Sequence, residues 1–449
     1  MPYKLLAVTL ALIVCAPLFA QDVPPPPEEA NVSKDAWAWS HRVELRGNYR
    51  WSEDEFIPNP FFDDDDPATP PEIFLRTPDP GSHVDLNVAE VQLDVFYGEW
   101  FQARAKIHAQ GMHRRNPTST DKQVDADELF VRIGQKPEFL DRPAGTSFFL
   151  QAGKFPKMER QPVRLLESYG LAATSFNRFE DIQLLAGGTV GRNFYWRFQA
   201  ANGNPVFLRD PNALAGDNGT LDEKFNNIGD YHSGFPIIYH AETEDYVFNT
   251  SHVQLGEALG YRWQRDDGTL GFDLIVFHYE RDLAEKEELT GTIYGGDIDL
   301  LDEGGPAGSN PDKINHLPIT GSRKKEEIGA RLFAEWHNAT VIAQYTAQEL
   351  AGLEREGMEL ELGYRLPWQL GWIESIQPAV RASRLDNHFV GVGPFPAPSL
   401  FWDWNKIDFG VRVGLPRGLD VTAEYTVHDM TSRRPLGTRE TLVTVRWRS

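Results

Sequence analysis

The chain is almost free of cysteine, because Cys15 is the only one among its 449 residues. A disulfide framework and a zinc site made of paired cysteines are therefore excluded. Positive charge is also scarce, with 44 lysines and arginines against 66 acidic residues and a formal net charge of −22. This sign is wrong for a partner with a phosphate backbone, so we expect no nucleic-acid binding.

The sequence lacks the short motifs that carry common chemistry. It has no HExxH pair of histidines, no glycine-rich phosphate loop and no GxSxG elbow around a serine nucleophile. We therefore predict no cofactor, no metal and no enzymatic activity, although a Ser-His-Asp set stays open because such residues meet only in the fold. The acidic run at 63–66 is a candidate calcium site, but a solvated loop is the preferred interpretation.

No long hydrophobic run follows residue 20, and a membrane-spanning helix would need roughly 20 apolar residues. The first 20 residues combine Lys4, an apolar stretch at 5–14, Pro17 and the small Ala20, which together predict a signal peptide over 1–20. An N-terminal membrane anchor is the alternative, and the short apolar stretch argues against it. Residues 21–36 contain four consecutive prolines and are predicted to form an extended tail.

What the chain has instead is alternation of apolar and polar residues. In SHRVELRGNYRW, residues 40–51, odd positions from Val43 to Trp51 are apolar or glycine, and even positions from Arg42 to Arg50 are charged or polar. Similar segments recur at 101–112, 359–366, 406–415, 421–428 and 438–448. A period of two indicates strands with one apolar face and one polar face.

Long and short connectors alternate between these strands. Long connectors are expected at 52–82, 112–123, 156–180, 202–250, 280–325, 349–355 and 385–404, and tight turns at 98–100, 190–192, 264–268, 337–339, 367–373 and 416–419. This pattern predicts an all-β fold, a transmembrane antiparallel β-barrel of about 16 strands over residues 37–449, with short periplasmic turns and long extracellular loops. Eighteen strands is the alternative count.

A soluble secreted β-sandwich or propeller is the rival fold. Against it, the apolar faces carry many alanines, which suit a wall facing lipid better than a densely packed core. Aromatic residues also gather at strand ends, as in the girdles of membrane barrels; they are Tyr49, Trp51, Tyr97, Trp100, Tyr261, Trp263, Trp336, Tyr364 and Trp447. Two irregularities remain: the apolar phase changes between 84–88 and 89–95, which a β-bulge would explain, and Glu257 falls on an apolar face.

The polar faces predict which side chains line a pore. About 15 inward cations stand against about 11 inward anions, and charged rings in a channel set its selectivity, so weak anion preference is our hypothesis. The alternative is that about half of these cations pair with carboxylates on neighbouring strands. The strand residues expected to line the pore are Arg42, Arg46, Arg50, Arg104, Lys106, Arg132, Arg197, Arg331 and Arg412.

The segment FPKMERQPVRLLESYGLAATSFNRFED, residues 155–181, mixes apolar and basic residues. We expect it to fold into the lumen, with Arg160 and Arg164 among the side chains that narrow the pore. An external loop with a helical turn at 162–169 is the alternative.

Four stretches resemble Gram-negative outer-membrane porins: DELFVRIG (127–134), FFLQAGKFP (148–156), SFNRFEDIQLLAGG (175–188) and NFYWRFQAANGNP (193–205). The phosphate-selective type is most similar and the alginate-export type second, although the lysine-rich ladder of the former is not evident. The resemblance implies that Lys154, in Gly-Lys-Phe before an inward-folded loop, lies near the constriction. It also implies a homotrimer.

Together these features predict a porin of the cell outer membrane through which small polar solutes, with anions preferred, diffuse passively. Its expected partners are outer-membrane lipid and those solutes. One alternative is a barrel that exports or binds a polysaccharide, with loops 202–250 and 280–325 as its binding surface. The other is an outer-membrane enzyme.

Overall fold

The computed structural model describes residues 36–53, 56–58, 73–76, 81–110, 124–136, 145–161, 163–176, 180–203, 248, 252–283, 322–350, 352–388, 403–431 and 436–449. The predicted signal peptide, most of the proline-rich tail and the acidic run at 63–66 lie outside these residues. Among the described residues, no helix is long and apolar enough to cross a membrane.

Seventeen strands form one antiparallel sheet, and two short strands, β2 (Phe56–Pro58) and β3 (Ile73–Arg76), pair separately. The strands of the large sheet are β1 (Trp37–Ser52), β4 (Gly81–Tyr97), β5 (Phe101–Gln110), β6 (Val124–Gly134), β7 (Ser147–Pro156), β8 (Glu180–Val190), β9 (Phe194–Ala201), β10 (Gln254–Gln264), β11 (Leu270–Asp282), β12 (Lys324–Trp336), β13 (Ala339–Leu350), β14 (Leu353–Tyr364), β15 (Leu366–Leu370), β16 (Ile373–Asn387), β17 (Asp403–Leu415), β18 (Leu419–Thr431) and β19 (Leu436–Arg448).

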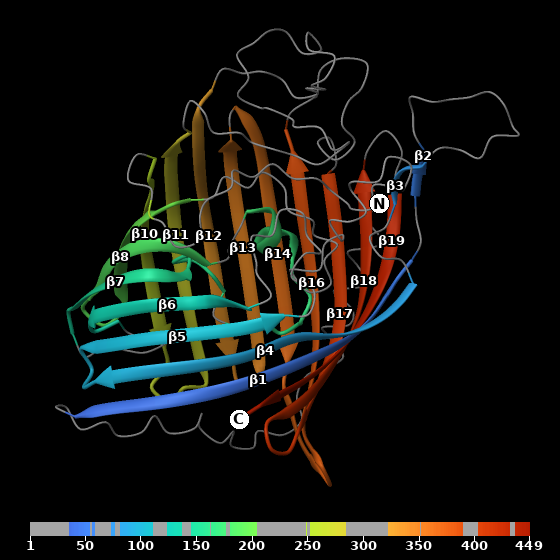
Figure 1. The fold of residues 1–449 in the computed structure, drawn as a ribbon, viewed down its shortest axis with the longest axis horizontal. Helices are drawn as coiled ribbons and strands as arrows, with labels where there is room; N and C mark the ends of the chain where they lie inside the picture. The colour runs from blue at the N-terminus through green and yellow to red at the C-terminus, as the bar shows by residue number, and fades with distance from the viewer. Residues whose placement is uncertain are drawn as a thin grey trace, which may run out of the picture. The chain divides into compact units, whose positions relative to one another are not determined.

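The sheet closes on itself, because β1 pairs with β4 on one side and with β19 on the other. β14 and β15 both pair with β16 and are separated only by Arg365, so they act as one strand of the wall. The result is a closed antiparallel barrel of 16 strands, which confirms the predicted fold class and strand number. In Figure 1, β1 and β4–β7 cross the direction of β12–β18, as tilted strands on opposite walls of a barrel do.

The connectors that the sequence predicted to be long or tight have those lengths, with one exception. Two others break the alternation: residues 135–146 join β6 to β7 at the tight-turn end, and only residues 432–435 join β18 to β19 at the other end. Tight turns join β4 to β5, β8 to β9, β10 to β11, β12 to β13 and β17 to β18 at one end of the barrel. At the other end, β13 and β14 are joined by residues 351–352 alone, so the long connector expected at 349–355 is wrong. It is short because both strands continue pairing up to Leu350 and Leu353.

The two faces of each strand have opposite character. On β1, the outward Leu45 is 42% exposed, whereas the preceding residue, the inward Glu44, is 5% exposed. Aromatic side chains also contact one another at the end of the barrel that carries the tight turns, where Trp37 packs against Tyr97 and Phe101. The alternation therefore separates an apolar outer surface from a polar interior, as the sequence predicted.

Both irregularities have a structural explanation. Arg46 pairs with Val88 and Gly47 with Leu86, so Asn87 is the extra residue of the predicted β-bulge. Glu257 does face outward with the apolar residues of β10, and its carboxylate lies 3.7 Å from Nδ1 of His278 on β11.

A charged residue placed on the outward face tests whether this face contacts lipid. Val276 lies midway along β11 on this face, so Val276→Arg should lower the free energy of unfolding from lipid vesicles by about 2–4 kcal/mol. The control Glu280→Arg lies on the same face near the strand end and should cost only about 0–1 kcal/mol. Guanidinium titration followed by tryptophan fluorescence measures both, and equal losses would contradict a lipid-facing wall.

Candidate functional site

The segment between β7 and β8 is tied by its backbone to carboxylates on inward faces of the barrel wall. Glu361 on β14 accepts hydrogen bonds from the backbone N–H groups of Leu165 and Leu166, at 2.8 and 3.1 Å. Glu424 on β18 accepts from the backbone N–H of Ser168 at 3.1 Å and from its hydroxyl at 2.6 Å. These charge-assisted bonds satisfy backbone donors that form no regular secondary structure.

Cations of the wall hold the carbonyl oxygens of the same segment. Arg381 donates to the carbonyl of Ser168 at 2.9 Å and to its hydroxyl at 2.7 Å, and also pairs with Asp408 at 2.9 Å. Three further donors and their carbonyl acceptors are Arg331 with Arg160, Lys406 with Tyr169, and Arg355 with Ser175. Side chains of the wall therefore bind both the backbone N–H groups and the backbone carbonyl groups of the segment.

Apolar contacts add to this attachment. Leu165 and Leu166 are buried in a cluster with Phe333, Ile342 and Ala379, which lie on inward faces of β12, β13 and β16. Burying a leucine side chain is worth about 1.5–3 kcal/mol. The barrel interior is therefore apolar where this segment lies against it, which strict alternation into polar inward residues did not predict.

Glycines on inward positions make room for the segment. A Cβ at Gly363 on β14 would lie 2.7 Å from Cδ1 of Leu165, and one at Gly410 on β17 would meet Cδ2 of Leu166. A glycine at such a place lets another part of the chain approach the backbone closely. The helix α2 (Leu171–Ser175) follows in the segment and contacts β13, β14 and β16 (Figure 1). Residues 165–168 form bends, and the helix lies at 171–175, further along the chain than the helical turn considered at 162–169.

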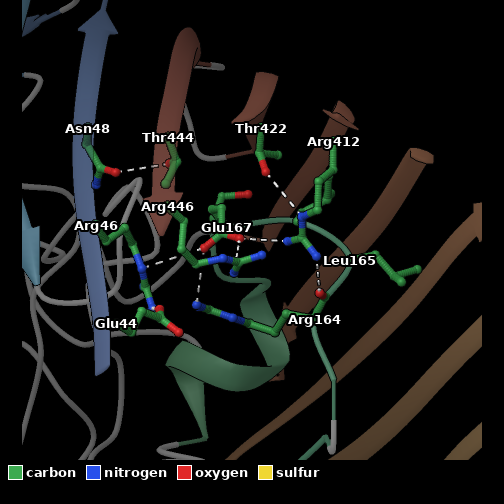
Figure 2. Close-up of polar contacts among 12 residues, drawn as sticks. Glu44, Arg46, Asn48, Arg164, Leu165, Glu167, Arg412, Thr422, Thr444 and Arg446 are labelled. Carbon is green, nitrogen blue, oxygen red and sulfur yellow. Dashed lines mark hydrogen bonds and ion pairs between the residues drawn. The ribbon is translucent and has the colours of Figure 1, made fainter. Parts of the chain in front are cut away.

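Glu167 points into a group of guanidinium side chains (Figure 2). Arg412 and Arg446 each donate to its Oε1 at 2.6 Å. Arg46 and Arg164 lie 3.9 and 3.8 Å from its Oε2. Burial opposes ionisation of Glu167, but the four guanidinium groups outweigh this and lower its pKa to about 2.

Elsewhere in the interior, three pairs have a cation that is more exposed than its carboxylate. Paired side chains and their exposures are Arg42 (44%) with Glu90 (7%), Arg160 (32%) with Glu180 (10%), and Arg104 (27%) with Glu128 (12%). The guanidinium ends therefore face solvent while their partners lie underneath. A dissolved ion near these pairs therefore contacts a guanidinium group before it contacts a carboxylate.

Most of the cations predicted to line the pore have a carboxylate within 4.0 Å. Six have such a partner on a neighbouring strand, which is about half, as the alternative expected, and at least nine of the twelve have one on some part of the chain. The nine are Arg42, Arg46, Arg104, Lys106, Lys154, Arg160, Arg164, Arg331 and Arg412.

The remaining three cations of the predicted set also lie on the wall. Arg197 donates to the carbonyl of Trp196 at 2.9 Å and lies over the rings of Phe149 and Tyr195. Arg50 is buried on the inward face of β1, and Arg132 alternates with the outward residues of β6. The structure thus groups Arg46, Arg164 and Arg412 around Glu167 and leaves the remaining predicted residues dispersed over the wall.

Sequence reasoning missed Glu167 and Arg355, because neither stands out within its own segment. The inward glycines were the available signal, since Gly357, Gly363 and Gly410 fall on the polar register of their strands, where a side chain is otherwise expected. Among the described residues, no group of three or more His, Cys, Asp or Glu side chains could hold a metal ion.

Comparison with known proteins supports the fold. No protein-family model matches the chain, and no curated protein does. The structure of OprB from Pseudomonas putida is similar, with a TM-score of 0.52 and 8% identity over 92% of this chain and 94% of that chain. The outer membrane channel DcaP of Acinetobacter baumannii has a TM-score of 0.49 and 9% identity over 93% and 99% of the two chains. An anion-selective porin from Comamonas acidovorans has a TM-score of 0.49 and 8% identity over 92% and 100%. The fold is that of a porin-like outer-membrane barrel.

The low pKa of Glu167 predicts how stability depends on pH. A carboxyl group whose pKa falls from about 4.5 to about 2 on folding stabilises the protein fully above pH 4.5 and loses this contribution as pH falls through 2. The free energy of unfolding of the wild type should therefore fall relative to Glu167→Gln by up to about 3 kcal/mol between pH 4.5 and pH 2. Denaturant titrations of both proteins from pH 7 to pH 2 measure this difference, and a difference that does not change with pH would contradict the ion-pair assignment.

Proposed function

We propose that this barrel is a channel of the cell outer membrane through which small polar solutes diffuse passively, with anions preferred. The observation that carries this proposal is the exposure of the interior cations, since Arg42 and Arg104 reach solvent while Glu90 and Glu128 lie beneath them. A fixed charge near the path of an ion raises the local concentration of the opposite charge. No cofactor is needed for this process.

The segment 155–181 is proposed to narrow the channel. Its contacts with β12, β14, β16, β17 and β18 occupy one side of the interior, so solutes would pass along the side formed by β1, β4, β5 and β6. Arg160 and Arg164 would then form one edge of the constriction, and Arg42 and Arg104 the other. Lys154 is proposed to lie beside this path with its partner Asp125, 3.3 Å away.

The finer assignments stay predictions. These are the phosphate-selective type, the alginate-export type with its polysaccharide, the homotrimer, and export to the outer membrane by a cleaved signal peptide. The loops on which polysaccharide binding would depend lie largely outside the described residues, and no described feature favours that alternative.

Reversal potentials across a planar bilayer test the channel. In a potassium chloride gradient the wild type should prefer chloride, and replacing Arg42, Arg104, Arg160 and Arg164 together by glutamine should shift the permeability ratio toward potassium by about fivefold. One charge about 4 Å from an ion in water is worth about 1 kcal/mol, which sets this scale. The control Arg265→Gln removes one exposed charge in the turn between β10 and β11 and should change nothing. Cation preference in the wild type, or an unchanged ratio in the fourfold variant, would contradict the proposal.

A further inference from the structure

The guanidinium groups around Glu167 outnumber the carboxylates that neutralise them. Arg446 makes a second ion pair with Asp420 at 2.9 Å, and Arg46 pairs with Glu44 at 2.6 Å. Glu44 in turn binds Arg448 at 2.9 Å. Five guanidinium groups, with Arg164 and Arg412 included, thus pair with three carboxylates, and Glu424, which binds the backbone N–H of Glu167, is a fourth carboxylate at the cluster. With all of them charged the net charge is +1, and without Glu167 it would be +2.

The cluster also has hydrogen-bonding capacity left over. Within the described part of the chain, Nε of Arg46 and Nη1 of Arg164 donate no hydrogen bond, and Oε2 of Glu167 accepts none, although all three atoms are buried. The Arg164 guanidinium is held in place over the ring of Tyr169, 4.3 Å from its centroid. Nε of Arg46 lies 3.9 Å from Oε2 of Glu167, so this donor faces the oxygen of Glu167 that accepts no hydrogen bond.

Solvent reaches this cluster from the interior. The side chain of Arg164 is 26% exposed, and those of Arg412 and Arg46 are 16% and 15% exposed, whereas that of Glu167 is 2% exposed. A small solute can thus contact the exposed parts of these arginine side chains before it contacts the glutamate.

We infer that these arginines form a binding site for small carboxylate anions, and that Glu167 occupies this site as a competitor tethered to the protein. The inference rests on the proposed channel function, because the anion arrives through the interior. Guanidinium groups suit this ligand, since their planar fork of donors matches the two oxygens of a carboxylate, and the group that already fills the site is a carboxylate.

Exchange of the two anions requires little movement. The backbone N–H groups of Glu167 and Ser168 are bound to Glu424, so the backbone stays fixed while the Glu167 side chain rotates away. An entering carboxylate first contacts the exposed parts of the Arg164 and Arg46 side chains. The buried Nε of Arg46 and Nη1 of Arg164 become accessible as Glu167 rotates away, and the carboxylate then replaces Glu167 on Arg412 and Arg446. The tethered anion keeps binding of the solute weak, and weak binding allows a solute to leave a channel as well as enter it.

The test measures conductance in planar bilayers at increasing concentrations of potassium acetate. Glu167→Gln keeps the size of the side chain and removes the competing charge, so the concentration giving half-maximal conductance should fall about tenfold, a change that one lost charge of this kind can produce. Adding Arg412→Met and Arg446→Met to Glu167→Gln should abolish that gain. The control Asp267→Asn removes a carboxylate that pairs with Arg265 in the turn between β10 and β11 and should leave the half-maximal concentration of acetate where it is.

The outcomes separate this inference from the channel proposal. A conducting wild type with the same half-maximal concentration in Glu167→Gln overturns the tethered competitor and leaves the channel standing. A tenfold fall for inorganic phosphate but not for acetate overturns the assignment of carboxylate as the ligand.

If the wild type does not conduct, the channel proposal fails, and saturation-transfer NMR of acetate with the detergent-solubilised protein decides the binding site instead. Stronger transfer in Glu167→Gln supports the site, and equal transfer overturns it. Should Glu167→Gln fail to fold, as judged by its gel mobility before and after heating, Glu167→Asp replaces it. The shorter carboxylate reaches the arginines less well, so the half-maximal concentration should still fall, and an unchanged value counts against the inference.

Discussion

Pairing of the first strand with the last is the constraint on which the rest of the structure depends. A lipid bilayer offers no hydrogen bonds to a peptide group, so a sheet that spans it must have no free edge. β1 meets this requirement by pairing residues Glu44–Ser52 with Glu440–Arg448 at the other end of the chain. Closure also gives every strand one face toward the interior. The charged and polar residues of each alternating strand lie on that face, because the other face contacts lipid.

The interior created in this way is divided between two kinds of environment. On the side of β12–β18, the segment that follows β7 covers the wall, and its amide and carbonyl groups bind Glu361, Glu424 and Arg381. On the side of β1 and β4–β6, Arg42 and Arg104 are more exposed than their partners Glu90 and Glu128. A net charge of −22 for the whole chain therefore coexists with solvent-exposed guanidinium groups inside the barrel. The cluster around Glu167 lies where these two sides meet, because Arg46 comes from β1 and Arg412 from β17.

Local patterns in the sequence predicted what depends on neighbouring residues. Alternation in SHRVELRGNYRW indicated the faces of β1, the change of phase near Asn87 indicated a bulge, and turn-like residues indicated most connectors. Contacts across the interior could not be predicted in this way, since they depend on the strand number and on the stagger of the closed sheet. Glu167 and Arg446 are 279 residues apart, and Phe333 is inward although it is apolar, because Leu165 and Leu166 cover it. The tethering of the segment by wall carboxylates is likewise visible only when both partners are placed.

Cross-linking tests most directly whether the segment after β7 lies inside the barrel. In a chain carrying Cys15→Ser, Leu165→Cys and Gly363→Cys should form a disulfide on mild oxidation, because a Cβ at Gly363 would lie 2.7 Å from Cδ1 of Leu165. The joined chain would migrate differently from the reduced chain on a denaturing gel without reductant. A pair of Leu165→Cys with Gly145→Cys serves as the control, since a Cβ at Gly145 has no neighbour within 4 Å. We predict that the disulfide between positions 165 and 363 forms rapidly and that the one between 165 and 145 does not. If the first forms no faster than the second, the segment after β7 does not lie inside the barrel.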